Sequence, residues 1–175
     1  MADKTVKFNA VVTLFPAKYV MHYVPVDLRT TEKFPFHGRT RRVLCSIDGT
    51  GAFPCALMPI KGGDFCISLS KDRMKQLGLK AGQNVVVHLT ADTSKYGMPM
   101  PAEFQEILDQ DIDGNRLFHA ITIGKQRSIL YMLGKIADVD RRIHIGLIII
   151  EHLKNNSGKI DDSTLYQEIK RPLGW

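Results

Sequence analysis

The chain has 175 residues, of which 44% are hydrophobic, 24% charged and 8% aromatic, and its formal net charge is +6. These values are typical of a folded globular protein and exclude disordered, collagen-like and disulfide-framework chains. The charge is unevenly distributed: residues 1–95 contain 14 Lys and Arg against 7 Asp and Glu, whereas residues 96–175 contain 10 against 11. The excess positive charge therefore belongs to the first half, where it favours anionic ligands or serves solubility alone.

The first half has the pattern of short strands joined by tight turns. Strands are predicted over 8–14, 42–47, 53–58, 65–69 and 84–89, where apolar residues alternate or run together. Glycine-containing turns at 48–51 and 61–64 predict two successive hairpins. Five strands at this spacing predict a small β-barrel.

Three further signals refine this half of the chain. A short, partly helical stretch is predicted to open at 24–28 and to end near Pro35, because a residue before proline disfavours the helical conformation. Ser70 and Gly78 predict the two ends of a helix over 71–77. Pro54 predicts that its strand lies at an edge or carries a bulge.

A change of composition over 91–101 predicts a linker, beyond which apolar residues follow the helical period. Helices are predicted from Pro101, around 117–121, after a break at Gly124, over 140–154 and over 161–170. The helix over 140–154 is apolar on most sides, which predicts a place at the centre of its bundle or against the barrel. The predicted fold class is α+β, with a barrel domain over 1–95 and a helical domain over 96–175.

Cysteine usage and targeting signals indicate a cytoplasmic protein without membrane insertion. Cys45, Cys55 and Cys66 form no CxxC pair, and we expect them to be small buried hydrophobes in a reducing compartment. The N-terminus lacks the layout of a secretory signal, and the apolar run 143–153 is about half of the roughly 20 residues that a membrane span needs.

No motif predicts a metal or cofactor. The histidines lack HExxH spacing, and no nucleophile elbow, Walker loop or dinucleotide fingerprint is present. Asp109, Asp111 and Asp113 resemble the opening of a calcium loop, but Ala120 stands where that loop requires glutamate. We expect a solvated helix end there.

Several segments together resemble two known families. The first half resembles the bacterial domain of unknown function 1905 in Phe36-His37-Gly38-Arg39, Arg42-Val43, Ile47-Asp48-Gly49, Leu57-Met58-Pro59 and Leu69-Ser70-Lys71. This resemblance implies a double-split β-barrel, an architecture shared with small DNA-binding and antitoxin-type transcription factors. The second half is similar to the helical YdeI/OmpD-associated, bacteriocin-protection family in Gly124-Lys125-Gln126-Arg127-Ser128, Tyr131, Lys135 and Arg141-Arg142-Ile143. That similarity implies an association with antimicrobial-peptide resistance.

Two basic clusters are candidate binding sites. The first contains Arg39, Arg41 and Arg42 near Phe34 and Phe36, as in proteins that bind phosphates and stack bases. The alternative is that the two aromatic rings pack under a loop while the arginines are solvated.

The second cluster contains Lys125, Arg127 and Ser128 at a predicted helix start, with Tyr131 one turn further on. A helix N-terminus with two cations favours a phosphate or carboxylate. The alternative is a structural cap in which Arg127 pairs with Asp138 or Asp140.

The leading interpretation is a non-enzymatic cytoplasmic binding protein that recognises an anionic ligand or a protein partner through the basic surface of the barrel. Nonspecific nucleic-acid binding and an enzyme with its site at the junction of barrel and helices are the alternatives. Nucleic-acid binding would weaken steeply with salt. A monomer and a homodimer both remain open.

Overall fold

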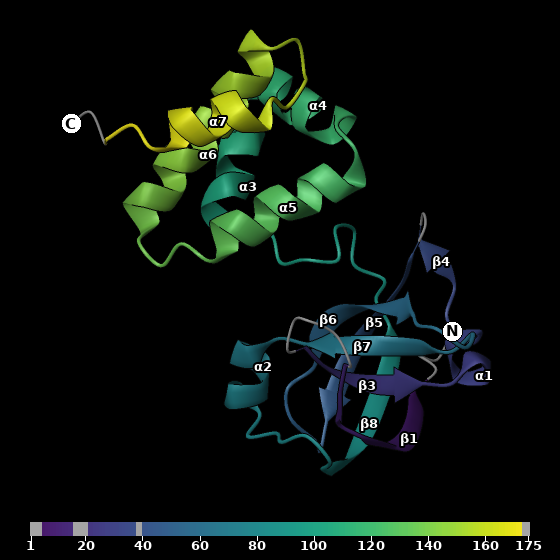
Figure 1. Ribbon diagram of the computed structural model, residues 1–175. Coiled ribbons are helices and arrows are strands. Elements are labelled where there is room, and N and C mark those ends of the chain that lie inside the picture. The colour runs from purple at the N-terminus through teal and green to yellow at the C-terminus, as the bar shows by residue number, and fades with distance from the viewer. Residues whose placement is uncertain (1–4, 16–20, 38–39, 173–175) are drawn as a thin grey trace. The chain divides into compact units, whose positions relative to one another are not determined.

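The computed structural model describes residues 5–15, 21–37 and 40–172, and the chain forms two compact units, Met1–Thr93 and Ser94–Trp175 (Figure 1). Each unit has its own hydrophobic core, so each is described by itself. The first unit contains β1 (Val6–Val11), β2 (Thr13–Leu14), β3 (His22–Val26), α1 (Leu28–Thr31), β4 (Phe36–His37), β5 (Thr40–Ile47), β6 (Phe53–Pro59), β7 (Phe65–Leu69), α2 (Lys71–Gln76) and β8 (Asn84–Ala91). The second contains α3 (Ala102–Gln110), α4 (Ile112–Ala120), α5 (Ile123–Gly134), α6 (Val139–Asn155) and α7 (Asp162–Ile169).

The first unit is a nearly closed antiparallel barrel. Its strands follow the order β1-β8-β5-β6-β7-β3-β2, with β4 paired to β5 at the side. The two ends of this path, β1 and β2, are consecutive in the chain and meet at Val12, so one continuous segment brings both ends of the sheet together. Val12 is fully buried and pairs with the 82–83 turn through hydrogen bonds of 2.9 and 2.7 Å. The predicted α+β class, with an N-terminal barrel followed by helices, is confirmed.

Apolar side chains from every long strand fill the barrel. The fully buried members of this core include Val24, Val43, Cys45, Ile47, Ile67, Leu69, Val87 and Leu89. In β5 and β8 they alternate with less buried residues, because successive side chains point to opposite faces of a sheet.

Two prolines explain where the sequence prediction of the strands was wrong. The stretch predicted as partly helical from 24 onward begins instead as β3, and helix α1 starts only at Leu28. Pro25 lies in β3 opposite Cys66 of β7, beyond the two residues of β3 that pair with β2. A strand tolerates proline there because the missing N–H falls on a side without a ladder partner.

Pro54 occupies a similar position in β6. It lies opposite Leu44 of β5, whereas β6 pairs with β7 only at Met58 and Pro59. Strand β6 is therefore interior in the strand order, but Pro54 stands in a part that is paired on one side only. Of the two predicted alternatives, an edge strand or a bulge, the edge strand does not hold for β6 as a whole. At Pro54 itself, however, the strand is paired on one side only, as at an edge, and this is the condition that proline requires.

The turns and the caps of α2 follow the sequence prediction. Asp48 and Gly49 both have positive φ angles, of 49° and 75°, as a tight hairpin between β5 and β6 demands. The Ser70 hydroxyl accepts a hydrogen bond from the Arg73 N–H at 3.2 Å, and Gly78 leaves the helix with φ 63°. These caps confirm the short helix between β7 and β8.

The second unit is a bundle around α6. This helix contacts α3, α4, α5 and α7, which confirms its predicted central place. It packs tightly against α3 at Gly146, where an added Cβ would lie 2.9 Å from Cδ1 of Ile107 and 3.1 Å from Cδ2 of Phe104. The fully buried side chains of this core are Phe104, Leu108, Phe118, Leu130, Leu133, Ile149 and Leu153.

Helix α5 starts earlier than predicted. Thr122 caps it and Gly124 lies within its first turn, so the predicted chain break at Gly124 was wrong.

Candidate functional site

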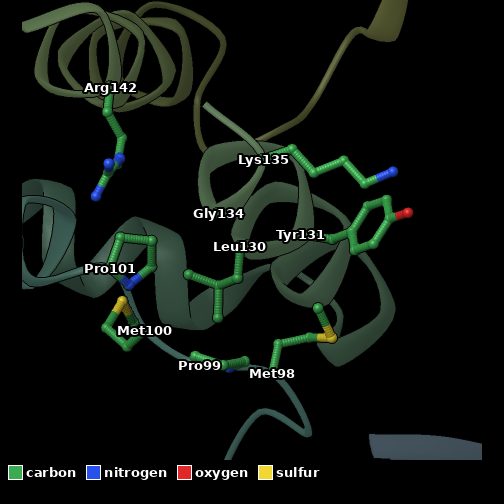
Figure 2. Close-up of a pocket in the computed structure, with 9 residues that line it drawn as sticks. All are labelled: Met98, Pro99, Met100, Pro101, Leu130, Tyr131, Gly134, Lys135 and Arg142. Carbon is green, nitrogen blue, oxygen red and sulfur yellow. The ribbon is translucent and has the colours of Figure 1, made fainter. Parts of the chain in front are cut away.

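A pocket of about 340 Å³ lies within the helical unit (Figure 2). It is bounded by three parts of the chain: the segment that leads into α3, the C-terminal half of α5 and the start of α6. The residues that line it are Met98, Pro99, Met100, Pro101, Leu130, Tyr131, Gly134, Lys135 and Arg142. Its volume falls within the range of roughly 300–1,000 Å³ that small-molecule sites occupy.

The segment 98–101 forms one wall, and its sequence keeps it extended. Pro99 and Pro101 fix their own φ angles and disfavour helix in the residues before them. Pro101 is the N-cap of α3, with φ −60° and ψ 134°. Met98 and Met100 are partly buried against the core of the helical unit, although the sequence had suggested a linker here.

The beginning of the unit is anchored by a short polar chain next to that wall. The Tyr96 hydroxyl lies 2.7 Å from Nε2 of His119, whose Nδ1 lies 2.9 Å from the carbonyl oxygen of Asn115. Because a carbonyl can only accept, Nδ1 carries the proton and Nε2 accepts from the tyrosine. The Tyr96 carbonyl in turn accepts a hydrogen bond from Nε of Arg127 at 2.5 Å. These bonds fix the chain two residues before Met98.

Helix α5 supplies the opposite wall from one face. Leu130, Tyr131, Gly134 and Lys135 share this face because residues three or four positions apart lie close together on a helix. Figure 2 shows Leu130 pointing toward Pro99, Met100 and Pro101, with Met98, Tyr131 and Lys135 at the other end. Gly134 leaves room, since an added Cβ there would meet no atom within 4 Å.

A positive charge is held at the rim of this apolar pocket. The Lys135 ammonium lies 4.5 Å from the centre of the Tyr131 ring, a cation–π contact. Lys135 is also the C-cap of α5, where the partial negative charge of the helix end favours a cation. Tyr131 is 50% exposed, so the pair stands at the boundary between the apolar wall and solvent.

Arg142 has a structural role at the other end of the pocket. Its Nη1 donates to both carboxylate oxygens of Glu103, at 2.9 and 3.1 Å. Its Nε and Nη2 donate to the carbonyls of Ile136 and Ala137, at 3.1 and 3.3 Å. The guanidinium thus links α3 to the connection between α5 and α6, and Arg142 forms part of the pocket wall.

The residues of the predicted anion-binding cluster lie on different faces of α5. Tyr131 lines the pocket described above, but Lys125 and Ser128 face a second hollow, of about 360 Å³, beside α7. There the Lys125 ammonium lies 2.6 Å from both carboxylate oxygens of Asp162. Ser128 donates to the Gly124 carbonyl at 3.0 Å, while the Nε–H of Arg127 is directed to the Tyr96 carbonyl. These side chains do not converge on one point. The anion-binding cluster therefore stays a prediction.

The barrel arginines make contacts within their own unit. Arg41 donates from Nη1 to the carbonyls of Thr31 and Phe34, and its guanidinium lies 4.1 Å from the centre of the exposed Phe36 ring. Arg42 forms an ion pair with the buried Asp92 at 3.5 Å. Phe34 is buried in the barrel core, so of the two aromatic residues of this cluster Phe36 is the exposed one. Arg39 lies outside the described residues.

Sequence reasoning missed most of the pocket. The sequence indicates Lys135 and Arg142 only through a family resemblance. It predicts a linker at Met98 and Met100. The available signal was the spacing of Tyr131, Gly134 and Lys135, which places an aromatic ring, a gap and a cation on one helical face.

The cysteine thiols are poor candidates for chemistry. The hydrogen bond with Cys45, together with burial, raises the pKa of the Cys55 thiol well above its ordinary value. Burial also raises the pKa of the Cys66 thiol. Because the thiolate is the nucleophile and the metal ligand, neutral thiols of this kind behave as small hydrophobic side chains.

Among the described residues, no group of three or more His, Cys, Asp or Glu side chains is arranged to hold a metal ion. Asp111 of the aspartate-rich stretch serves as the N-cap of α4 and accepts hydrogen bonds from the Gly114 N–H and Lys154. No helix in the described ranges combines the length and the apolar character that crossing a membrane requires.

Comparison with known families agrees with the architecture of the first unit. Residues 8–89 match the family described as "Domain of unknown function (DUF1905)", so the barrel carries a DUF1905 domain. The match runs from β1 into β8 and thus covers nearly the whole strand path. No curated protein matches the chain. The similarity of the second half to the YdeI/OmpD-associated family receives no support from these comparisons and stays a prediction.

Proposed function

We propose that this protein is a non-enzymatic binding protein whose helical unit takes an amphipathic anion, an apolar body that ends in a carboxylate or a similar group. The observation that carries this proposal is the pocket of about 340 Å³, with its apolar walls and the Lys135 ammonium over Tyr131 at the rim. The apolar body would lie against Leu130 and the methionines, and the anionic group would meet the lysine.

The residues that line the pocket explain why we expect the ligand to have both an apolar body and an anionic group. Burial of apolar surface supplies affinity without direction, at roughly 25 cal/mol per Å². A charge at the rim adds orientation, because an anion is attracted to the ammonium while its apolar end stays inside. Methionines at two wall positions adapt to ligands of different outline, since the thioether chain is unbranched and polarisable.

The pocket is a better candidate than the basic surface of the barrel. The Arg41 and Arg42 guanidinium groups are directed to carbonyls, an aromatic ring and a buried carboxylate of their own unit. Salt dependence distinguishes the nucleic-acid alternative from binding of a small amphipathic anion, because the affinity for nucleic-acid phosphates falls steeply as the salt concentration rises. The YdeI/OmpD-associated resemblance adds a proposed setting for such a binding protein, which is stress or antimicrobial-peptide resistance in the bacterial cytoplasm.

Calorimetric titration with octanoate, octylamine and octanol tests the proposal directly. Octanoate should bind with a dissociation constant on the order of 0.1–1 mM, octanol more weakly, and octylamine least. Gly134→Leu should abolish octanoate binding because its side chain fills the pocket. Lys135→Met should weaken octanoate binding about two- to fivefold and leave octanol binding unchanged.

Helix α7 offers a matched control for the lysine substitution. Lys170 is its C-cap, and the Lys170 ammonium lies 4.0 Å from the centre of the Tyr166 ring, as in the pair on α5. Lys170→Met removes the same kind of contact from a different helix and should leave octanoate binding intact. Equal binding of octylamine and octanoate, or octanoate binding by Gly134→Leu, would show that the proposed function is wrong.

A further inference from the structure

A second surface of the helical unit, separate from the pocket, is a groove between α3 and α6. Its volume is about 500 Å³, and its floor consists of Ile107 of α3 with Ile143 and Leu147 of α6. Leu147 is 47% exposed, whereas the next three residues of α6 are buried. The bundle therefore leaves part of the apolar face of its central helix uncovered.

The two helices build this groove through their close crossing. Gly146 brings the backbone of α6 against Phe104 and Ile107 of α3, so that an added Cβ there would lie 2.9 Å from Cδ1 of Ile107. Ile143 and Leu147 are one turn apart on α6, so they form a continuous apolar row. Along α3 the rim runs from Glu103 to Gln110, about 10 Å or two helical turns.

The rim of the groove is acidic. Helix α3 carries Glu103, Glu106 and Asp109 and no lysine or arginine between Ala102 and Gln110. Glu103 is paired with Arg142, whereas Glu106 is exposed and its carboxylate accepts a hydrogen bond from the side-chain amide of Gln110 at 2.6 Å. A partner would thus meet an apolar floor beside a negatively charged edge.

From this juxtaposition we infer that the α3–α6 groove is a docking site for a cationic amphipathic helix of a partner protein. Such a helix would place apolar side chains at i, i+3 or i+4 and i+7 on the floor and a lysine or arginine opposite Glu106. Charge complementarity selects this occupant: nucleic acid and anionic lipid are repelled by the acidic rim. A second copy across a two-fold axis would bring one acidic edge against another.

Fluorescence anisotropy with two synthetic peptides tests this inference on the full chain. The first is an amphipathic helix of roughly 18 residues made of leucine and lysine, and the second has glutamate in place of every lysine. The lysine peptide should bind at least tenfold more tightly than the glutamate peptide, and its affinity should fall as NaCl rises from about 50 to 300 mM because the charges are exposed.

Two substitutions locate the site, and each has a matched control on α4. Leu147→Gln and Glu106→Lys should each weaken the lysine peptide at least tenfold. Ile112→Gln, at an apolar residue that is 84% exposed, and Asp113→Lys, at an exposed carboxylate, should leave the affinity unchanged. We expect all four variants to fold, because all four side chains lie on the surface. Circular dichroism of each variant checks this.

The opposite results would overturn the inference. They are equal affinity for the two peptides, no binding of the lysine peptide at millimolar concentration, or full affinity in Leu147→Gln. Sedimentation that shows a dimer of the unmodified chain and a monomer of Leu147→Gln would also overturn it, because a second copy would then be the occupant. Neither Leu147 nor Glu106 lines the octanoate pocket, so this inference and the proposed function can fail independently.

Discussion

The buried His152 and the partly buried Glu168 form a pair that joins α6 to α7: Nδ1 of the imidazole lies 2.7 Å from a carboxylate oxygen of the glutamate. Nε2 of the same ring accepts a hydrogen bond from the Asp161 N–H at 3.1 Å. A backbone N–H can only donate, so Nδ1 carries the proton that Glu168 accepts. One neutral histidine thereby holds both the N-cap residue and the last turn of α7.

His152→Ala should detach α7 from the bundle. The substitution leaves a carboxylate and a backbone N–H without their partner and opens a cavity, so we expect a loss of about 2–4 kcal/mol in the free energy of unfolding. Hydrogen exchange should show the loss first in the amides of α7. Glu168→Gln is the control, because its amide oxygen can still accept from Nδ1, and a loss there as large as in His152→Ala would contradict this account.

Two glycines of the helical unit should respond to alanine in opposite directions. At Gly134 an added Cβ meets nothing within 4 Å, so Gly134→Ala should raise the stability of α5 by about 0.5–1 kcal/mol through helix propensity. At Gly114 the Cβ would overlap Ile150 and lie 2.9 Å from Cγ of Asp111. Gly114→Ala should cost about 1–3 kcal/mol. Urea unfolding of both variants checks the pair, and two changes of the same sign would contradict the packing described.

The sequence predicts those parts of the fold that local chemistry determines. The Asp48-Gly49 turn requires positive φ angles, and Ser70 can cap a helix by itself, so both were predictable from a few neighbouring residues. Strand β3 was not, because Pro25 disfavours a strand and only the distant β7 compensates by pairing on one side. The closure of the barrel at Val12 likewise depends on strands far apart in the sequence.

The candidate site shows the same limit more strongly. Met98 and Met100 have the composition of a linker and gain a role only where α5 packs beside them. The Arg41 and Arg42 side chains look available for phosphate in the sequence, yet their partners are two backbone carbonyls and the buried Asp92. Charge counts cannot reveal such partners, because they are brought close by tertiary structure alone.

Asp111 should make the helical unit sensitive to acid. The hydrogen bond from Lys154 and then that from the Gly114 N–H lower the pKa of this carboxyl below its ordinary value. A carboxyl with a lowered pKa in the folded state stabilises the protein above its unfolded pKa of about 4, and this contribution is lost as pH falls from there through the lower pKa of the folded state. The pair is partly exposed, so the contribution should stay below about 1 kcal/mol.

Melting temperatures of the unmodified chain and of Asp111→Asn between pH 7 and pH 3 measure this contribution. Asparagine keeps the capping oxygen for Gly114 but loses the charge that faces Lys154. The variant should melt lower at pH 7, and the difference should shrink as pH falls from about 4 toward 3. Lys154→Met should reproduce the deficit at pH 7, and a difference that is constant with pH would show that the charge has no part in it.

In the barrel, Arg42 and Asp92 form an ion pair whose carboxylate side chain is only 1% exposed, and the Asp92 N–H also donates to the Arg42 carbonyl at 3.2 Å. Arg42→Met should cost about 3–5 kcal/mol, because it leaves a buried carboxylate without its cation. The double variant Arg42→Met/Asp92→Asn should recover most of that loss, since no buried charge remains. Hydrogen exchange of β5 and β8 amides reports on this unit directly. If the double variant is as unstable as Arg42→Met, the arginine contributes through packing of its side chain instead of its charge.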